Sequence, residues 1–570
     1  MKIDSGSSKN NRIEGTGTSR PHTGEVDGPQ QSSFVSQINL VHRVNLQNVT
    51  IDQQTLADRN VADNEPPLRH LRLGGTVLKS GLLLFLGKGI TQVCSFVRNV
   101  IVARVIGVEN FGIAATFSIT ISILDMLGSI SADKLLIQAR DGNVEKFQST
   151  AHAMQALRGC ISGLLIVACA KPLAELFGTP EATWAFRYLA LVPILRGLVH
   201  LDPQRIQREL KYGPSVGLDI AQQLIPTLLA WPLALWVRDY SAVLWLLAVQ
   251  SAIAAIGSFI VSRRPYRWHW NSEYFGRFLN FGWPLIINGV LLFGVYQGDR
   301  FLIASAKKLF GADIYSLKEL GVFSVAVSLT LTPMVALGSI SSSLMLPLFS
   351  GLQTNPVELR RQYAFCSEVV GLLSGFFAIP LILAGGWVVT TVYGTDYKAA
   401  GAFIGWMAAA QAIRMARFTP SMTAMAFADT TNAMISNLIR SSALIATLWV
   451  VSSGGTLKWV AVSGFFGELA GLVVCLWKLK RNHQIPGNLG IKPAMLLVAM
   501  MGLAGLIAAA LPSPGPAVNL LLITVLTTLF AGSMLLFFPE LRSLTRLLHS
   551  GLALRKPNIT GAAIPVSRDA

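Results

Sequence analysis

Apolar stretches of roughly twenty residues follow one another from about residue 76 to residue 540, with short polar breaks between them. A helix of that length crosses the ~30 Å hydrocarbon core of a bilayer, and it satisfies its own backbone hydrogen bonds there. Charged residues make up only 14% of the chain, whereas soluble proteins carry about 25%. The sequence therefore predicts an all-α integral membrane protein of about fourteen transmembrane helices, centred near residues 92, 124, 160, 194, 226, 251, 290, 332, 375, 409, 440, 469, 502 and 528.

Basic residues predict how these helices are oriented. Lysine and arginine gather in alternate breaks, which marks those breaks as cytoplasmic, and an even helix count then leaves both termini in the cytoplasm. The net charge of +17 is explained in this way rather than by nucleic-acid binding. The breaks predicted to be cytoplasmic contain Arg205, Arg208 and Lys211; Arg263, Arg264 and Arg267; Arg360 and Arg361; Arg414 and Arg417; and Lys478, Lys480 and Arg481.

Two pairs of similar segments indicate that the chain contains an internal repeat. The turn LFGT at 176–179 precedes a helix with Arg196, and YGT at 393–395 precedes a helix with Arg414. Likewise, a helix that Gly87 opens ends before FG at 111–112, and a helix that Gly282 opens ends before LG at 320–321. Because an even number of helices separates the matches, the repeats should be parallel and related about the membrane normal, an architecture found in transporters.

The repeat and the composition together divide the chain into five segments. Residues 1–75 are polar and are predicted to be a disordered cytoplasmic tail, because they bury too little apolar area to fold. We expect six-helix lobes at 76–265 and 266–482 around a central cavity, two additional helices at 483–540, and a basic cytoplasmic tail at 541–570.

The sequence contains no motif that predicts an enzyme, a metal site or a cofactor. The segment GLLLFLGKG at 81–89 differs from a phosphate loop in its spacing and lacks the final Ser or Thr. The five cysteines lie in apolar stretches without metal-ligand spacing, so we interpret them as packing residues. We therefore expect neither a cofactor nor a bound metal.

Ionisable and polar side chains inside the apolar helices are the candidate functional residues, because each is costly when it faces lipid. They are Arg98, Asp125, Arg158, Arg196, Asn288, Tyr296, Asp299 and Arg300. Arg98 and the Asp299–Arg300 pair belong to the first helices of the two lobes and are expected to line the cavity. Alternatives remain for the others: Arg158 and Arg196 could extend to an interface, and Asp125 could only pair with a neighbouring arginine. Another group lies near predicted helix ends, where interface placement is expected: Arg414, Arg417, Asp429 and Arg440.

Several short segments resemble the multidrug/oligosaccharidyl-lipid/polysaccharide exporter superfamily, and in particular its polysaccharide transporter or Wzx-like branch. They are FVRN at 96–99, ARVIG at 103–107, FG at 111–112, GWPL at 282–285 and DRFLI at 299–303. The likeness covers about residues 76–482. It implies two lobes around a cavity that opens alternately to each side of the bacterial inner membrane, and a polyprenyl-pyrophosphate-linked oligosaccharide as cargo.

The resemblance also implies roles for individual residues. Related lipid II flippases have an arginine in the motif matched by Arg98, which assigns this side chain to the cavity; Asn99 replaces a commonly acidic neighbour. The expected substrate-binding set is Arg98, Arg158, Arg196, Asn288, Tyr296 and Arg300, with Asp125 and Asp299 in ion or proton coupling. Besides the bilayer, a polysaccharide polymerase and a chain-length regulator are expected partners.

Two other functions are weighed against a flippase for exopolysaccharide, capsule or O-antigen assembly. A cation-coupled drug exporter of the same superfamily would favour a carboxylate-rich cavity, whereas several intramembrane charges here are arginines. A membrane polymerase or ligase would need a large extracytoplasmic loop with catalytic residues, and every such loop is short in this sequence.

Overall fold

The computed structural model describes residues 68–127, 132–139, 141–209, 211–311, 313–511 and 515–543. Most of the two predicted tails, residues 1–67 and 544–570, lies outside these ranges. The chain divides into two compact units, Met1–Leu73 and Gly74–Ala570. The described part of the first unit is the start of helix α2 (Leu68–Leu127), so this helix begins within the segment that was predicted to be tail. Every regular element in the described ranges is helical, which confirms the predicted all-α class.

The N-terminal lobe begins with α2, which is two membrane-spanning segments joined at a kink. Gly107 has φ 81°, ψ 169° in the middle of α2, a conformation that glycine adopts without steric cost. The chain therefore reverses there without a loop. The remaining helices of this lobe are α3 (Ala132–Gln138), α4 (Glu145–Leu176), α5 (Thr183–Leu189), α6 (Leu191–Gly197), α7 (Asp202–Gln207), α8 (Gly213–Val237) and α9 (Ser241–Val261).

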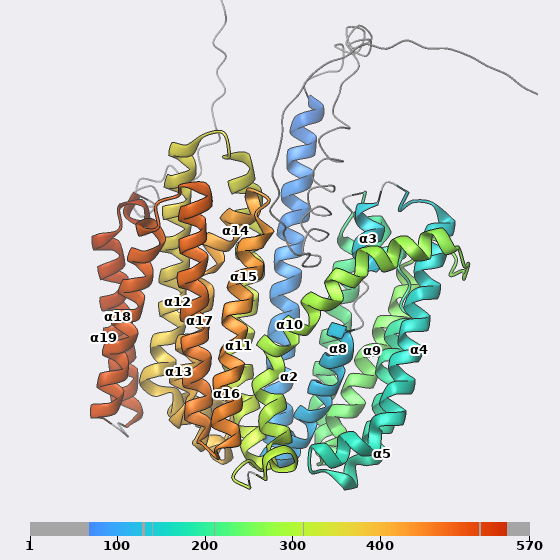
Figure 1. The fold of residues 1–570 in the computed structure, drawn as a ribbon, viewed down its shortest axis with the longest axis horizontal. Helices are drawn as coiled ribbons and strands as arrows, with labels where there is room; N and C mark the ends of the chain where they lie inside the picture. Colours follow the sequence, from blue (N-terminus) through green and yellow to red (C-terminus); the bar gives the residue numbers. More distant parts are fainter. Residues whose placement is uncertain are drawn as a thin grey trace, which may run out of the picture. The chain divides into compact units, whose positions relative to one another are not determined.

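Three helices of the C-terminal lobe begin with a side-chain cap. Asn271, Asn355 and Asp429 each accept a hydrogen bond from the backbone N–H three residues later, which satisfies a free donor of the first turn. The helices are α10 (Ser272–Phe310), α11 (Leu317–Gly351), α12 (Pro356–Tyr393), α13 (Ile404–Ala416), α14 (Phe418–Ala426), α15 (Thr430–Ser441), α16 (Ala443–Ser452) and α17 (Leu457–His483). Two further helices, α18 (Asn488–Ala510) and α19 (Pro516–Phe537), pack against α12 (Figure 1).

Every predicted helix centre falls within a helix of the structure. In the described part of the chain, ten helices are long and apolar enough to cross a membrane, and one of them contains the kinked pair in α2. The lobe helices α5–α6, α10 and α13–α14 are outside that group because they are short, interrupted or too polar. The total of fourteen spans stays a prediction.

The repeated segments adopt matching conformations in the two lobes. Gly178 and Gly394 both have positive φ, at 68° and 105°, after the long helices α4 and α12. Helix α6, which follows the short α5, and helix α13 then carry Arg196 and Arg414 near their C-terminal ends. The sequence matches therefore correspond to equivalent turns.

The second pair of matches forms a direct contact between the lobes. A Cβ on Gly112 of α2 would meet the backbone carbonyl of Leu317, and a Cβ on Gly321 of α11 would meet that of Val108, both closer than 3.0 Å at the oxygen. Each would also lie 3.2 Å from the other glycine's backbone nitrogen. This reciprocal contact is what a two-fold relation between the repeats requires, and only glycine permits it.

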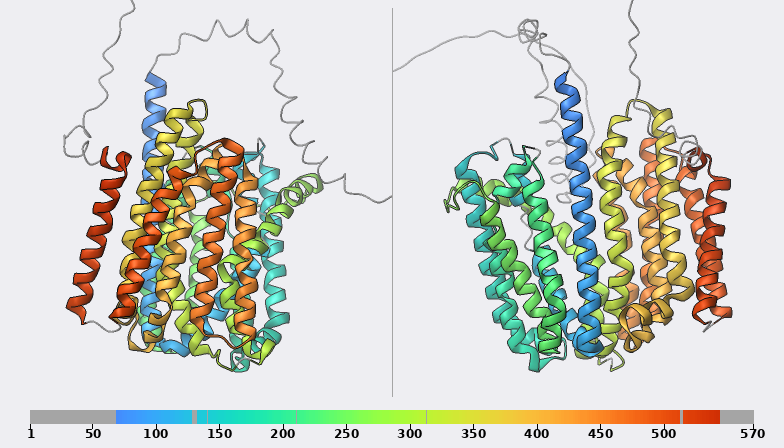
Figure 2. Two further views of the ribbon diagram at one scale, coloured as in Figure 1. Left: turned by 60° about the vertical axis from the view of Figure 1, so that its left-hand side comes forward. Right: turned by 180° about the vertical axis from the view of Figure 1, so that it is seen from behind.

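Helix α10 connects the two lobes. Its first turns pack on α4, where Phe278 stacks on Phe147 at 4.7 Å between ring centroids and Arg277 pairs with Asp141. Its later turns pack on α11 and α16 (Figure 2). The boundary at residue 266 stays a prediction, and α10 contacts helices on both sides of it.

Candidate functional site

A cavity of about 220 Å³ lies between the lobes, among α2, α9, α10 and α11. We call it the inter-lobe cavity. Its polar lining comes from Arg98, Asn99, Ser118, Gln250, Arg300, Ser324 and Ser328. No carboxylate is among the described residues that line it.

Arg98 reaches this cavity from α2 and has a neutral partner. Its Nη1 donates to Oε1 of Gln223 on α8 at 3.1 Å. The next residue, Asn99, donates from Nδ2 to the hydroxyl of Ser328 on α11 at 3.3 Å and so links the lobes. An amide that binds α11 therefore stands in place of the acid beside Arg98, and Arg98 forms no ion pair with another residue of the described ranges.

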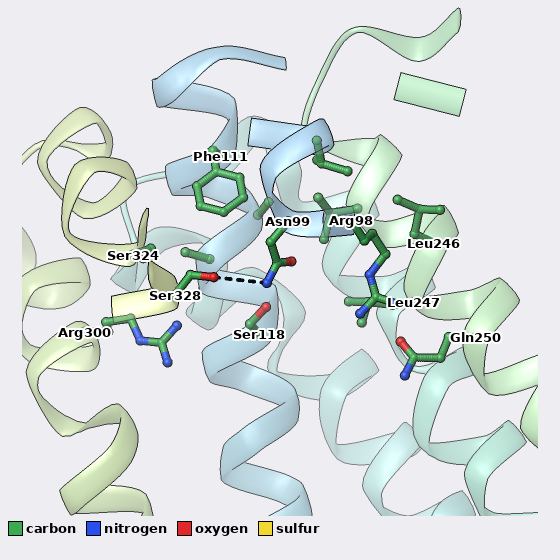
Figure 3. A pocket seen from close by; sticks show the side chains of 14 residues that line it. Arg98, Asn99, Phe111, Ser118, Leu246, Leu247, Gln250, Arg300, Ser324 and Ser328 are labelled. Carbon is green, nitrogen blue, oxygen red and sulfur yellow. Dashed lines mark hydrogen bonds between the residues drawn. The ribbon is translucent and has the colours of Figure 1, made fainter. Parts of the chain in front are cut away.

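Arg300 reaches the same cavity from α10. Its Nε is buried without a hydrogen-bond partner, and no ion pair to it is found within the described ranges. Figure 3 shows Arg98 and Arg300 on either side of the Asn99–Ser328 hydrogen bond. Two guanidinium groups without a carboxylate favour an anion, which arginine binds through paired N–H donors.

The preceding residue of α10, Asp299, faces a different part of the molecule. Its Oδ1 accepts a hydrogen bond from Thr447 of α16 at 3.1 Å, and Thr447 also contacts Ser463 of α17 at 2.8 Å. Asp299 lines a smaller cavity of about 70 Å³ inside the C-terminal lobe. Asp299 and Arg300 are thus adjacent in sequence but line different cavities.

A buried group of charges shares that smaller cavity. Glu468 of α17 lies 2.5 Å from Arg414, 2.9 Å from Arg440 and 4.0 Å from Arg417. We call these four residues the Glu468 cluster. Tyr296 belongs beside them, because the guanidinium carbons of Arg414 and Arg440 lie 5.2 and 5.5 Å from its ring centroid.

Two expectations are corrected by this cluster. Interface placement is wrong for Arg414, Arg417 and Arg440, whose side chains are at most 12% exposed inside the lobe. Tyr296 was expected in the substrate cavity, but the structure places it against the cluster instead. By contrast, Asp429 caps the start of α15, as expected of a residue at a helix end.

The N-terminal lobe has its own polar cavity of about 330 Å³, between α2, α4 and α6. Asp125 lies 2.5 Å from Arg196 and 3.6 Å from Arg158 in it. All three side chains are about one-third exposed. Arg158 and Arg196 are therefore brought together by Asp125 and do not line the inter-lobe cavity, and Asp125 has the arginine partners that the alternative interpretation anticipated.

The remaining predicted site residue, Asn288, has a side chain outside the described part of the structure. Several residues of the sites were missed at the sequence level. Gln223, Gln250, Ser324 and Ser328 gave no signal beyond being polar within apolar helices. Glu468 is a single acidic residue within an apolar stretch, and its distance in sequence from the three arginines gave no sign that they converge on it.

Outside the membrane-spanning helices, Asp202 organises the end of the N-terminal lobe. This fully buried carboxylate lies 2.6 Å from Arg205 and accepts the backbone N–H of Arg263 at 2.8 Å. Burial alone would raise the pKa of Asp202, but the hydrogen bonds from Arg205 and Arg263 outweigh it and hold that pKa below its usual value. Asp202 is thus ionised, and it links the start of α7 to the segment between α9 and α10.

Comparisons with known proteins identify the family of the chain. A family model described as polysaccharide biosynthesis protein matches residues 101–402. The amylovoran biosynthesis protein AmsL of Erwinia amylovora is 23% identical over 272 residues, which are 47% of this chain and 68% of that protein. The succinoglycan biosynthesis transport protein ExoT of Rhizobium meliloti (strain 1021) is 23% identical over 221 residues, 39% of this chain and 44% of that protein.

Solved structures share the fold at low identity. The lipid II flippase MurJ in an inward closed conformation has a TM-score of 0.60 and 13% identity, covering 79% of this chain and 98% of that one. An inward-facing multidrug resistance MATE family transporter of the MOP superfamily has a TM-score of 0.54 and 14% identity, covering 69% and 96%. These structures show that the chain shares their fold, as the sequence resemblance implied.

Proposed function

The chain belongs to the polysaccharide biosynthesis protein family, and from that premise we propose that it flips a polyprenyl-pyrophosphate-linked oligosaccharide across the bacterial inner membrane. The carrying observation is the inter-lobe cavity, where Arg98 and Arg300 present two guanidinium groups and the described lining has no carboxylate. The export serves exopolysaccharide, capsule or O-antigen assembly in this proposal.

The chemistry of the cavity suits the pyrophosphate of such a cargo. Pyrophosphate carries at least two negative charges, and each guanidinium can donate two parallel hydrogen bonds to its oxygens. The cavity of about 220 Å³ is smaller than the 300–1,000 Å³ of typical ligand pockets. A cavity of this size holds the pyrophosphate alone. The lobes must therefore separate to admit the sugars, while the polyprenyl chain stays in lipid.

The proposed mechanism is alternating access by two lobes. The Gly112–Gly321 contact holds one end of the lobes together, and Asn99 joins α2 to α11 beside the cavity. An anion bound by Arg98 of one lobe and Arg300 of α10 contributes most when the lobes are close together. Cargo binding would thus favour the state in which both arginines reach it.

Asp299 and Asp125 are proposed for ion or proton coupling, with different support. Asp299 accepts one hydrogen bond, from Thr447, in a cavity that also holds the Glu468 cluster. Asp125 is engaged by Arg196 and Arg158, so a change in its charge would release two arginines. A polysaccharide polymerase and a chain-length regulator are proposed as partners downstream of the flipped cargo.

The test is the leaflet distribution of lipid-linked repeat units in cells depleted of the protein and complemented with variants. Arg98→Gln and Arg300→Gln should each leave complete repeat units on the cytoplasmic leaflet, at least tenfold above wild type. Arg481→Gln is the matched control, because Arg481 lies over Trp477 at the end of α17. Surface expression and thermal unfolding of each variant establish that it is folded.

Two outcomes would overturn the proposal. Normal delivery of repeat units in depleted cells would exclude this cargo and favour a drug exporter. Delivered but unpolymerised units would instead favour an enzyme acting after translocation. If only the Arg300 variant is transport-competent, the pyrophosphate site must be reassigned to Arg98 alone.

A further inference from the structure

The Glu468 cluster places an excess of positive charge in the interior of the C-terminal lobe. Its residues come from three separate parts of the lobe: Arg414 and Arg417 at the end of α13, Arg440 on α15 and Glu468 on α17. Arg440 is 6% exposed and Glu468 is 2% exposed. Both lie near the middle of their membrane-spanning segments, Thr430–Ser452 and Leu457–His483.

The charges of this region do not balance. Three arginines contribute three positive charges, and Glu468 with neighbouring Asp299 contributes two negative ones, which leaves one positive charge among the described residues. Buried charges of one sign are costly because the low-dielectric interior neither hydrates nor screens them. The ring of Tyr296 beneath Arg414 and Arg440 offsets part of this cost through its negative face, but it adds no charge.

The cluster also has unused hydrogen-bond donors beside an internal space. Nη2 of Arg440 is buried without a hydrogen-bond partner in the described part of the chain. Arg440, Arg414 and Gln411 line the cavity of about 70 Å³, together with Asp299 and Glu468. A single water needs roughly 10–15 Å³ of such space, so a small ion fits and a phosphate-linked sugar does not.

We infer that this cavity is a binding site for one monovalent inorganic anion of the chloride class, held by Arg414 and Arg440. One such anion brings the net charge of the cluster and Asp299 together to zero, and it accepts a hydrogen bond from the free N–H of Arg440. It joins α13 and α15, and through Glu468 and Asp299 also α17 and α10. The site is separate from the inter-lobe cavity and does not depend on the identity of the cargo.

Thermal unfolding of the purified full-length protein in lipid nanodiscs tests the inference. Chloride and bromide should raise the Tm with a saturable dependence on concentration, relative to gluconate at the same ionic strength. Arg440→Gln removes the excess charge and the free donor, so it should abolish this saturable shift. Arg481→Gln, which removes an arginine over Trp477 at the end of α17, should retain it.

Bromide-substituted crystals provide a second readout that does not depend on any variant. An anomalous peak beside the guanidinium groups of Arg414 and Arg440 is expected in the wild-type protein. If Arg440→Gln fails to fold, this peak decides the question. The inference is overturned if the peak is missing, or if the anion response is the same in wild type and Arg440→Gln and therefore reflects general salt effects. A flippase defect without an anion effect would leave the proposed function intact while refuting this site.

Discussion

Replacing Gly321 by alanine should force the lobes apart at the Gly112–Gly321 contact. The added Cβ would lie 3.1 Å from the carbonyl carbon of Val108, closer still to its oxygen, and 3.2 Å from the backbone nitrogen of Gly112. These are backbone atoms, so no flexible side chain can move to make room. The helices α2 and α11 must separate, or the local backbone must distort.

The size of the effect follows from the cost of overpacking. Inserting a methyl group into a closely packed region costs about 1–3 kcal/mol. If the lobes separate at this end in the other state of the transporter, that cost falls only on the state seen here. A difference of 1–3 kcal/mol corresponds to a change of about 5- to 150-fold in the ratio of the two states.

Distances between spin labels on the two lobes measure that ratio. In a background without the five native cysteines, labels at Arg238 after α8 and at Asp313 between α10 and α11 report the separation at this end. Gly321→Ala should shift the population toward longer distances. The double variant with Gly112→Ala should cost less than the sum of the two single changes, because one separation relieves both clashes.

The matched control is Gly502→Ala on α18, where an added Cβ meets nothing within 4 Å. It should leave the distance distribution unchanged and raise helix stability slightly. Our reasoning is refuted if Gly321→Ala gives the same distribution as Gly502→Ala while remaining folded. If Gly321→Ala fails to fold and the double variant costs the sum of the two single changes, the added Cβ clashes in every state of the protein. That outcome would refute the explanation by a shift between two states, but not the clash itself.

Three further predictions concern contacts outside the cavities. Arg205 is the main cause that lowers the folded-state pKa of Asp202, against the opposing effect of burial. The contribution of Asp202 to stability is therefore present above its unfolded pKa of about 3.9 and is lost as the pH falls below that value. Thermal unfolding from pH 7 to pH 3 should show this loss, and Asp202→Asn should reduce the dependence of the Tm on pH. Gly375→Ala should loosen α19 from α12, because the added Cβ would overlap the ring of Phe530; faster hydrogen exchange confined to α18 and α19 would check it, and an unchanged pattern would contradict it. Arg104→Gln should weaken the lobe contact, since its guanidinium donates to two carbonyls at the end of α12; a longer label distance at that end is the expected readout, and no change would contradict the role.

Much of the fold could be predicted from the sequence because lipid allows few solutions. Helices are the only way for an isolated segment to satisfy its backbone in hydrocarbon, so each apolar stretch predicted a helix. The repeat was also accessible, since the turns at Gly178 and Gly394 need positive φ and therefore carry glycine in both lobes. The start of α2 was less accessible, because the sequence around Leu68 is polar and tail-like although the structure is helical there.

The sites were harder to predict, because the sequence shows which helix carries a charged residue but not which residue of another helix pairs with it. Arg98 and Arg300 were both expected to line the cavity, because each belongs to the first helix of a predicted lobe. Tyr296 and Asp299 share a helix face with each other, and that face turns toward α16 and the Glu468 cluster. Only the packing of α13, α15 and α17 shows that Glu468 meets three arginines, which no spacing within one helix could reveal.

The two lobes use their matching arginines differently, and exposure accounts for the difference. Arg196 and Arg414 follow equivalent glycine turns, yet Arg196 pairs with Asp125 of α2 and Arg414 with Glu468 of α17. The repeated element is therefore the arginine, while its acid comes from a different helix in each lobe. Arg196 is 33% exposed and Arg414 is 12% exposed. An ion pair in contact with water contributes little, about 0–1 kcal/mol, so the Asp125–Arg196 pair can separate at small cost. Breaking a buried pair costs about 3–5 kcal/mol, so the Glu468 cluster resists separation, and only an ion small enough to enter its cavity can bind beside it.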